Sequence, residues 1–184
     1  MIRLPGSNSP AVVDERQFKD LMAAVCAPVT IVTGVSGSAP VGVTVSAFGS
    51  LSLEPRLVSV ALDLRSSVLD TIRKTERFGV NVLSQCQAEI AMRFASRCED
   101  RFADVAWGWD GGLPRLAGST GWLSCEVHEV VPAGDHALVI GRVVGAARAK
   151  HAPLVYAERI FGTHSQFASS PPISMPERVA SCAR

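Results

Sequence analysis

The segment Gly134-Asp135-His136 holds the histidine whose surroundings suit chemistry best in this 184-residue sequence. Gly-Asp predicts a tight turn, after which His136 begins a strand beside a carboxylate. A single histidine is most often structural, but one at the rim between a barrel and a loop lies where ligands bind. The other histidines, His128, His151 and His164, show no metal-ligand spacing. No GxSxG or HExxH motif occurs, so the sequence indicates neither a nucleophile elbow nor a zinc site.

Hydroxyl side chains interrupt the apolar run from Val41 to Phe48. Thr44 and Ser46 alternate with apolar residues, which predicts a strand. The hydroxyls either face water from a half-buried edge strand or line a ligand site. The pattern alone favours the edge strand.

A strand end and a helix start meet between Asp63 and Ser67. The hydroxyls of Ser66 and Ser67 and the free backbone N–H groups of a helix start suit an anion such as phosphate. A plain N-cap is the favoured alternative. Arg93, on a helix rich in small residues, either binds a phosphate through paired hydrogen bonds or forms a surface ion pair.

The composition excludes several classes of protein. Hydrophobic residues make up 47% and charged residues 19%, which indicates spare apolar surface and an oligomer. A membrane span and a secretory signal are not expected, because no long apolar run or hydrophobic N-terminal segment occurs. The net charge of +1 and the absence of a Lys/Arg block give no sign of a basic surface that would bind nucleic acid. Five cysteines without a CxxC pair indicate buried free thiols in a reducing cytosol.

Short strands and a few helices must position these residues. Phe18, Leu21, Met22 and Val25 form an apolar stripe at helical spacing, and Ser84 with Gln87 fits a capping box. We predict helices over 14–25, 67–74 and 84–95, strands over 29–33, 41–46, 57–62, 78–83, 122–130 and 137–147, and a long loop over 107–118. The first two strands and the last two form hairpins. The strands do not alternate strictly with helices, so the prediction is a mainly β fold, a barrel with peripheral helices.

The chain is predicted to be one domain with two tails. Residues 1–13 and the Ser/Pro-rich residues 165–184 read as a flexible leader and tail around a domain over 14–164. No GxGxxG follows a strand and no phosphate-binding P-loop occurs, so a dinucleotide fold of the usual kind is not expected.

The order of several runs resembles the short-chain flavin reductase family, which has the FMN-binding split-barrel fold. A helix is followed by Thr30-Ile31-Val32-Thr33, the Gly42 to Phe48 run and Ser50-Leu51-Ser52-Leu53-Glu54-Pro55. Then come Phe78 to Leu83, Arg93-Phe94-Ala95, Gly134-Asp135-His136 and Pro153-Leu154-Val155-Tyr156. The resemblance covers residues 14–164. Cys125 to Glu129, with Ala133 to His136, looks most like reductases that serve aromatic and antibiotic-tailoring oxygenases.

The resemblance implies a set of site residues. His136 would lie beside the nicotinamide as the catalytic residue, and no metal is implied. The flavin would contact two strands, a helix start and a second helix, and the residues implied to bind flavin or pyridine nucleotide are Val41, Gly42, Val43, Thr44, Ser46, Ala47, Ala61, Leu62, Asp63, Ser66, Ser67, Arg93, Phe94, Lys150, His151 and Pro153. Pro28 and Arg56 depart from the family pattern but remove no ligand group.

The resemblance implies an NAD(P)H:flavin oxidoreductase in the cytoplasm, a homodimer that supplies reduced flavin to a partner monooxygenase. FAD or FMN would be the flavin and NADH the donor, with NADPH possible. Hydride transfer belongs to the cofactors, so the protein needs only to stack two rings, which accounts for the absence of a nucleophile. The alternatives are a non-catalytic flavin-binding split barrel and an enzyme like pyridoxamine-phosphate oxidase.

Overall fold

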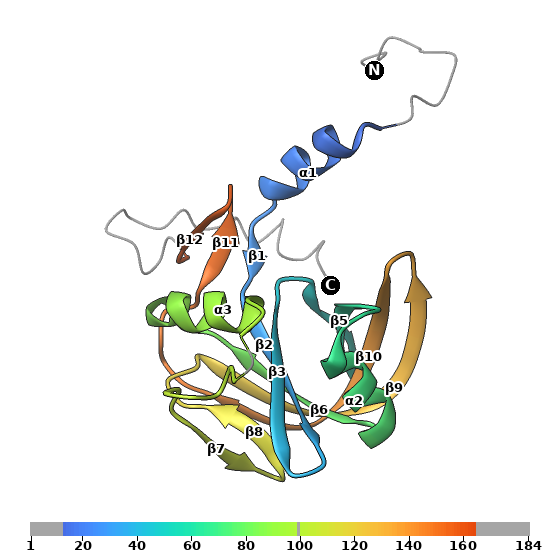
Figure 1. The fold of residues 1–184 in the computed structure, drawn as a ribbon, viewed down its shortest axis with the longest axis vertical. Coiled ribbons are helices and arrows are strands. Elements are labelled where there is room, and N and C mark those ends of the chain that lie inside the picture. Colours follow the sequence, from blue (N-terminus) through green and yellow to red (C-terminus); the bar gives the residue numbers. More distant parts are fainter. Residues whose placement is uncertain (1–12, 99, 165–184) are drawn as a thin grey trace.

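The protein is mainly β, as the sequence predicts (Figure 1). The computed structural model describes residues 13–98 and 100–164. The predicted tail, and the predicted leader except for Val13, lie outside the described residues.

Seven antiparallel strands form the main sheet, in the order β3-β2-β6-β9-β10-β5-β4. They are β2 (Thr30–Ser36), β3 (Ala39–Val45), β4 (Phe48–Leu53), β5 (Arg56–Asp63), β6 (Arg77–Val82), β9 (Gly121–Ala133) and β10 (His136–Arg148). The two edge strands, β3 and β4, are joined by only Ser46 and Ala47, and Ala61 N on β5 donates to Ala47 O at 3.0 Å. The sheet therefore bends into a barrel that is split between β3 and β5.

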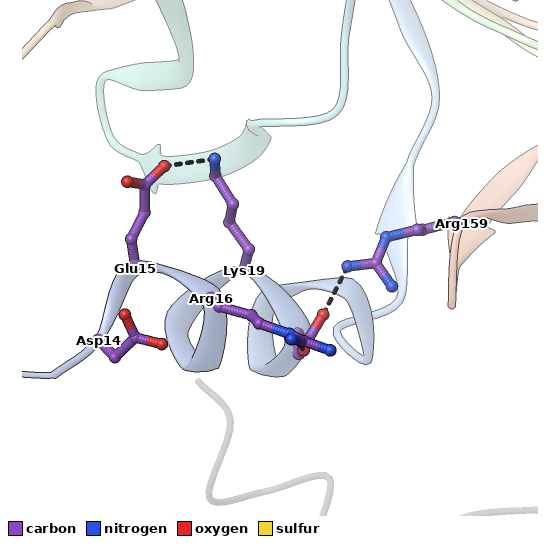
Figure 2. Close-up of a pocket in the computed structure, with 6 residues that line it drawn as sticks. Asp14, Glu15, Arg16, Lys19 and Arg159 are labelled. Carbon is purple, nitrogen blue, oxygen red and sulfur yellow. Dashed lines mark hydrogen bonds and ion pairs between the residues drawn. The ribbon is translucent and has the colours of Figure 1, made fainter.

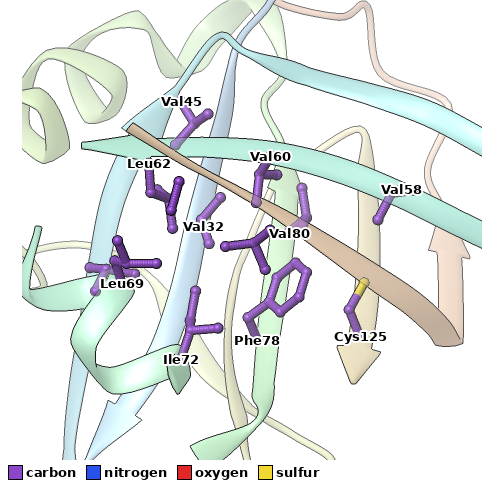
Figure 3. Close-up of a cluster of buried hydrophobic side chains, with 13 residues drawn as sticks. Val32, Val45, Val58, Val60, Leu62, Leu69, Ile72, Phe78, Val80 and Cys125 are labelled. Atoms are coloured by element: carbon purple, nitrogen blue, oxygen red, sulfur yellow. The ribbon is translucent and has the colours of Figure 1, made fainter. Parts of the chain in front are cut away.

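The inside of the barrel is filled by alternate residues of its strands (Figure 3). On β5, Val58, Val60 and Leu62 are buried and the residues between them are not, which is the two-residue period of a strand. Helix α2 (Ser67–Thr75) adds Leu69 and Ile72, both fully buried. Each such side chain contributes about 1.5–3 kcal/mol of burial free energy. Burial also raises the pKa of the Cys125 thiol to about 12.

A second core lies under helix α3 (Ala88–Ala95), outside the barrel. The helix predicted over 84–95 begins as one turn of 3-10 helix, Gln85–Gln87, before α3. The capping box is confirmed, since Ser84 N donates to Gln87 Oε1 at 3.0 Å. Phe94 is fully buried here and meets Phe102 edge-on, with ring centroids 4.9 Å apart.

The predicted loop over 107–118 is wrong, because it contains the hairpin β7 (Trp107–Asp110) and β8 (Leu113–Leu116). Gly111 and Gly112 connect the strands with φ of +58° and +83°, the left-handed conformation that two-residue hairpin turns require. Asn81, buried on β6, ties the hairpin to the barrel: its Oδ1 accepts from Leu116 N at 2.7 Å. The Gly111-Gly112 pair is the sequence signal for a hairpin turn that the loop prediction overlooked.

Helix α1 (Glu15–Ala23) extends away from the rest of the described structure (Figure 1). It leads into a small sheet of β1 (Ala27–Pro28), β11 (Val155–Ala157) and β12 (Ile160–Gly162). The predicted apolar stripe is present but uncovered, with Leu21 64% and Phe18 55% exposed. Among the described residues, no helix has both the length and the apolar character needed to cross a membrane.

Candidate functional site

A cavity of about 220 Å³ lies where the barrel is split, and we call it the β3–β5 cavity. The end of β3, the end of β5, the start of α2 and the start of β10 meet there. Its lining residues are Val43, Thr44, Val45, Ser46, Ala47, Ala61, Leu62, Asp63, Ser66 and His136. All of them except Val45 are among the residues predicted from the sequence.

The β3 edge of this cavity offers backbone groups to a ligand. Strand β3 pairs only with β2, so the N–H and C=O groups on its other side have no strand partner. Ser66 is the N-cap of α2, but its hydroxyl makes no capping hydrogen bond. The Thr44 hydroxyl, in contrast, donates to Ala91 O at 2.6 Å and holds α3 against β3. The cavity therefore presents mixed donors and acceptors on an apolar wall, which suits a flat heterocycle.

Four charged or ionisable side chains stand at the mouth of the cavity. His136 lies opposite Asp63 in the β5–β10 register, and its Nδ1 is 2.7 Å from Asp135 Oδ1. Arg65 binds Asp63 through Nε and Nη2 at 3.1 and 2.8 Å, and these contacts hold the pKa of Asp63 well below its usual range. The hydrogen bond with His136 likewise lowers the pKa of Asp135. Leu64 N donates to Asp135 O, so the two turns that carry these groups are fixed to each other.

A second cavity, of about 190 Å³, continues along β3 on the other side of the α2 start, and we call it the β3–α2 cavity. It contains three predicted residues, Val41, Gly42 and Ser67, and its other lining residues, missed from the sequence, are Pro40, Cys98, Asp100, Arg101 and Phe102. The two cavities share the length of β3 and adjoin at neighbouring residues, Ser66 in one and Ser67 in the other.

Several predicted residues lie outside both cavities. Phe94 is fully buried beneath Gly42, where a Cβ would come within 2.8 Å of its ring, so it supports β3 from behind. Arg93 is half-buried on α3 and lines neither cavity. Lys150, His151 and Pro153 follow β10, and Pro153 pairs with Ser84. Within one chain these three residues do not reach the β3–β5 cavity.

A third hollow, of about 440 Å³, lies beside α1, and its character is different (Figure 2). Its charged side chains bind one another: Lys19 donates to Glu15, and Arg159 donates to Asp20 at 2.7 Å. The first contact lies within α1, and the second ties α1 to the turn between β11 and β12. Exposed and mutually paired charges of this kind do not indicate a ligand site.

The described residues contain no group of three or more His, Cys, Asp or Glu side chains that could hold a metal ion. The β3–β5 cavity holds one histidine and no cysteine, and none of its three hydroxyl residues, Thr44, Ser46 and Ser66, is hydrogen-bonded to that histidine. An elongated groove with polar edges fits the binding and stacking of two cofactors.

Comparison with known proteins places the chain in a family. The family model of the flavin reductase like domain matches residues 22–165. The chain belongs to this family. NADH:FMN oxidoreductase of Rhodococcus erythropolis is 40% identical over 139 residues, which are 72% of each chain. The reductase subunit HsaB of a flavin-dependent monooxygenase from Mycobacterium tuberculosis is 36% identical over 134 residues, again 72% of each.

A solved structure with a similar fold is NADH:FAD oxidoreductase SgcE6 of Streptomyces globisporus C-1027, in complex with NAD and FAD fragments. It has a TM-score of 0.78 and 31% identity, and covers 85% of this chain and 94% of its own. The split-barrel prediction is thus confirmed. The chain spans 58% and 43% of two further curated relatives, both from Rhizobium meliloti.

Proposed function

We propose that this flavin reductase domain binds a flavin in the β3–β5 cavity and reduces it with a nicotinamide nucleotide. The observation that carries the proposal is the meeting of nine predicted site residues in one cavity at the split of the barrel. Two of the relatives above bear the name of NADH:flavin oxidoreductases. When bound, the flavin supplies the hydride acceptor and the nicotinamide supplies the donor.

The residues of this chain would bind and orient the two cofactors and exclude water from between them. The open edge of β3 and the Ser66 hydroxyl would hydrogen-bond the flavin, and Val43, Ala61 and Leu62 would form the apolar wall. His136, held on its Nδ1 side by Asp135, would keep its other ring nitrogen for the nicotinamide. Ser67 and the N–H groups at the α2 start would hold the flavin phosphate.

We propose that the reduced flavin leaves for a partner monooxygenase, as the name of HsaB states for its own system. The cavity supports this proposal because it opens at the rim of the barrel and can release its ligand without opening the core. An oxygenase of aromatic or antibiotic-tailoring type would be the partner, and NADH the donor, with NADPH possible.

We further propose a homodimer in the cytoplasm. Helix α1 has no buried residue, and its apolar face continues in Val25, which is 54% exposed. Leu51 and Leu53 on the edge strand β4 are 51% and 87% exposed. A second copy that covers these surfaces would remove them from water. The predicted burial of the free thiols is wrong for Cys26, Cys86 and Cys98, which are free and exposed. Exposed free thiols still favour a reducing compartment.

The test is anaerobic mixing of the purified protein with FMN or FAD and NADH or NADPH, followed through the visible absorbance of the flavin. We expect at least one pair to be reduced much faster than in the same mixture without protein. Binding of flavin without faster reduction would refute the reductase assignment and favour a flavin carrier. A lack of flavin binding would refute both.

A further inference from the structure

A hollow of about 450 Å³ lies between the start of α3 and the strand β12, and we call it the α3–β12 hollow. Ala88, Leu154 and Phe161 supply its apolar wall, and Cys86 and Thr163 lie among its other lining residues. None of the described residues that line it is Asp, Glu, Lys, Arg or His, and none of them lines either of the β3 cavities. The proposed function therefore makes no use of this hollow.

Backbone and hydroxyl contacts hold the walls of the hollow together. Gln85 N donates to Ala152 O at 2.8 Å, so the segment before β11 is fixed to the start of α3. The Thr163 hydroxyl donates to Pro153 O at 2.8 Å and fixes the end of β12 to the same segment. A binding segment would thus meet a surface that is already formed, which lowers the cost of ordering on binding.

Part of the apolar surface at the hollow remains in contact with water. Ala88 and Phe161 pack against the second core but are only partly buried. Met92 lies one helical turn beyond Ala88 on the same face of α3 and is 55% exposed. A segment that covered the hollow would remove this surface from water.

The chain itself leads out of this hollow into residues 165–184, which lie outside the described residues. Thr163 lines the hollow, and His164 is the last described residue. Phe167 follows Thr163 by four residues, so chain geometry keeps the two Cα atoms within about 14 Å of each other. The first large apolar side chain after β12 is therefore within reach of the hollow.

The sequence of residues 165–176 suits an uncharged, apolar surface. It contains no Asp, Glu, Lys, Arg or His, and its large apolar residues are Phe167, Ile173 and Met175. The Pro171-Pro172 pair restricts the backbone, so less conformational entropy is lost when the segment binds in an extended form. Proline-rich segments commonly bind grooves that are lined by aromatic side chains, as Phe161 lines this one.

We infer that residues 165–176 bind back into the α3–β12 hollow of their own chain, with the Phe167 side chain against Ala88 and Phe161. The bound segment covers Cys86, which is exposed in the described structure. The family model ends at residue 165, so the family assignment does not describe this contact. The inference is independent of the proposed function, because it needs neither flavin nor pyridine nucleotide.

The test measures how fast Cys86 reacts with N-ethylmaleimide in the full-length protein, in Phe167→Ser and in a protein shortened to end at His164. Peptide mass spectrometry follows each cysteine separately, without flavin or nucleotide. We expect Cys86 to react about fivefold or more faster in both altered proteins, because loss of the buried phenyl ring removes much of the free energy that holds the segment in place.

Two kinds of control accompany this measurement. Cys26 and Cys98 are exposed outside the hollow, so their rates should be the same in all of the proteins. Val179→Ser removes an apolar side chain of the same tail outside residues 165–176, and Cys86 should stay as slow in this variant as in wild type.

Equal rates for Cys86 in wild type, Phe167→Ser and the shortened protein would overturn the inference. Faster reaction of Cys26 and Cys98 as well as Cys86 in Phe167→Ser would indicate a general loosening and would also overturn it. Protection of Cys86 that increases with protein concentration would assign the hollow to the tail of a second copy and refute binding within one chain. None of these results affects the reductase proposal, which anaerobic flavin reduction tests separately.

Discussion

Gly42 lies between the β3–α2 cavity, which it lines, and Phe94 of the second core, and replacing it by alanine tests how closely β3 packs against that core. A Cβ at this position would lie 2.8 and 3.0 Å from two ring carbons of Phe94 and 3.4 Å from Phe102. Phe94 is fully buried and in edge contact with Phe102, so its ring has little room to retreat.

Two opposing effects determine whether Gly42→Ala raises or lowers the free energy of unfolding. The backbone of Gly42 is not left-handed, so the lower entropy of the unfolded chain should stabilise the variant by about 0.4–1 kcal/mol. Overpacking against the ring costs about 1–3 kcal/mol. The net prediction is a loss of about 1–2 kcal/mol, or roughly 2–8 °C in Tm for a domain of this size.

Chemical and thermal denaturation measure this loss, and Gly49→Ala is the matched control. Gly49 also lies on an edge strand, but its added Cβ would meet only Ser59 Oγ at 3.7 Å, so we expect no loss of stability. Phe94→Leu should make room for the added methyl, and the double variant Gly42→Ala/Phe94→Leu should lose less than the sum of the single losses, by about 0.5 kcal/mol or more. If Gly42→Ala were as stable as Gly49→Ala, Phe94 would not be packed against β3 as described.

Three further predictions concern the mouth of the site and the dimer. His136→Ala should lower the rate of flavin reduction by NADH about tenfold or more and change flavin affinity less, as stopped-flow and binding titrations would show; an unchanged rate would remove His136 from the mechanism. Asp135→Asn should lower the free energy of unfolding at about pH 6, and this loss relative to wild type should shrink as the pH falls below about 4, because the pKa of Asp135 is lowered in the folded state and its contact with His136 is lost on protonation. A loss that does not change with pH in urea titrations would contradict this. Leu21→Glu should convert a dimer into a monomer in sedimentation experiments, since it places a charge on the exposed face of α1; an unchanged dimer would show that α1 is not at the interface.

The elements that line the β3–β5 cavity were predictable from local signals: Thr44 and Ser46 interrupt an apolar strand, Ser66 starts a helix, and His136 follows a Gly-Asp turn. Their assignment to one site was not, since each run by itself favours an ordinary structural role. That assignment came from the resemblance to the flavin reductases, which rests on the order of the runs. The helix signals were equally local, as the confirmed capping box at Ser84 shows.

Arg101 could not be predicted, because its role depends on a contact with Gly42, 59 residues away. The sequence around it shows only a charged turn. The exposure of the stripe on α1 could not be predicted for a similar reason: helical spacing identifies Phe18 and Leu21 as one face, but it does not tell what covers that face. The separate placement of Lys150 to Pro153 likewise depends on where the chain runs after β10.

The central claim is that the flavin is reduced in the cavity between β3 and β5, and Ala47→Trp tests it most directly. Ala47 is an exposed residue of the cavity lining, so an indole there should fill the cavity without disturbing the core. Ala106→Trp, at an exposed position before β7, is the control. Anaerobic reduction of flavin by NADH should be lost in Ala47→Trp and retained in Ala106→Trp, with both variants as stable as wild type. Reduction at the wild-type rate by a folded Ala47→Trp variant would place the flavin elsewhere and contradict the account.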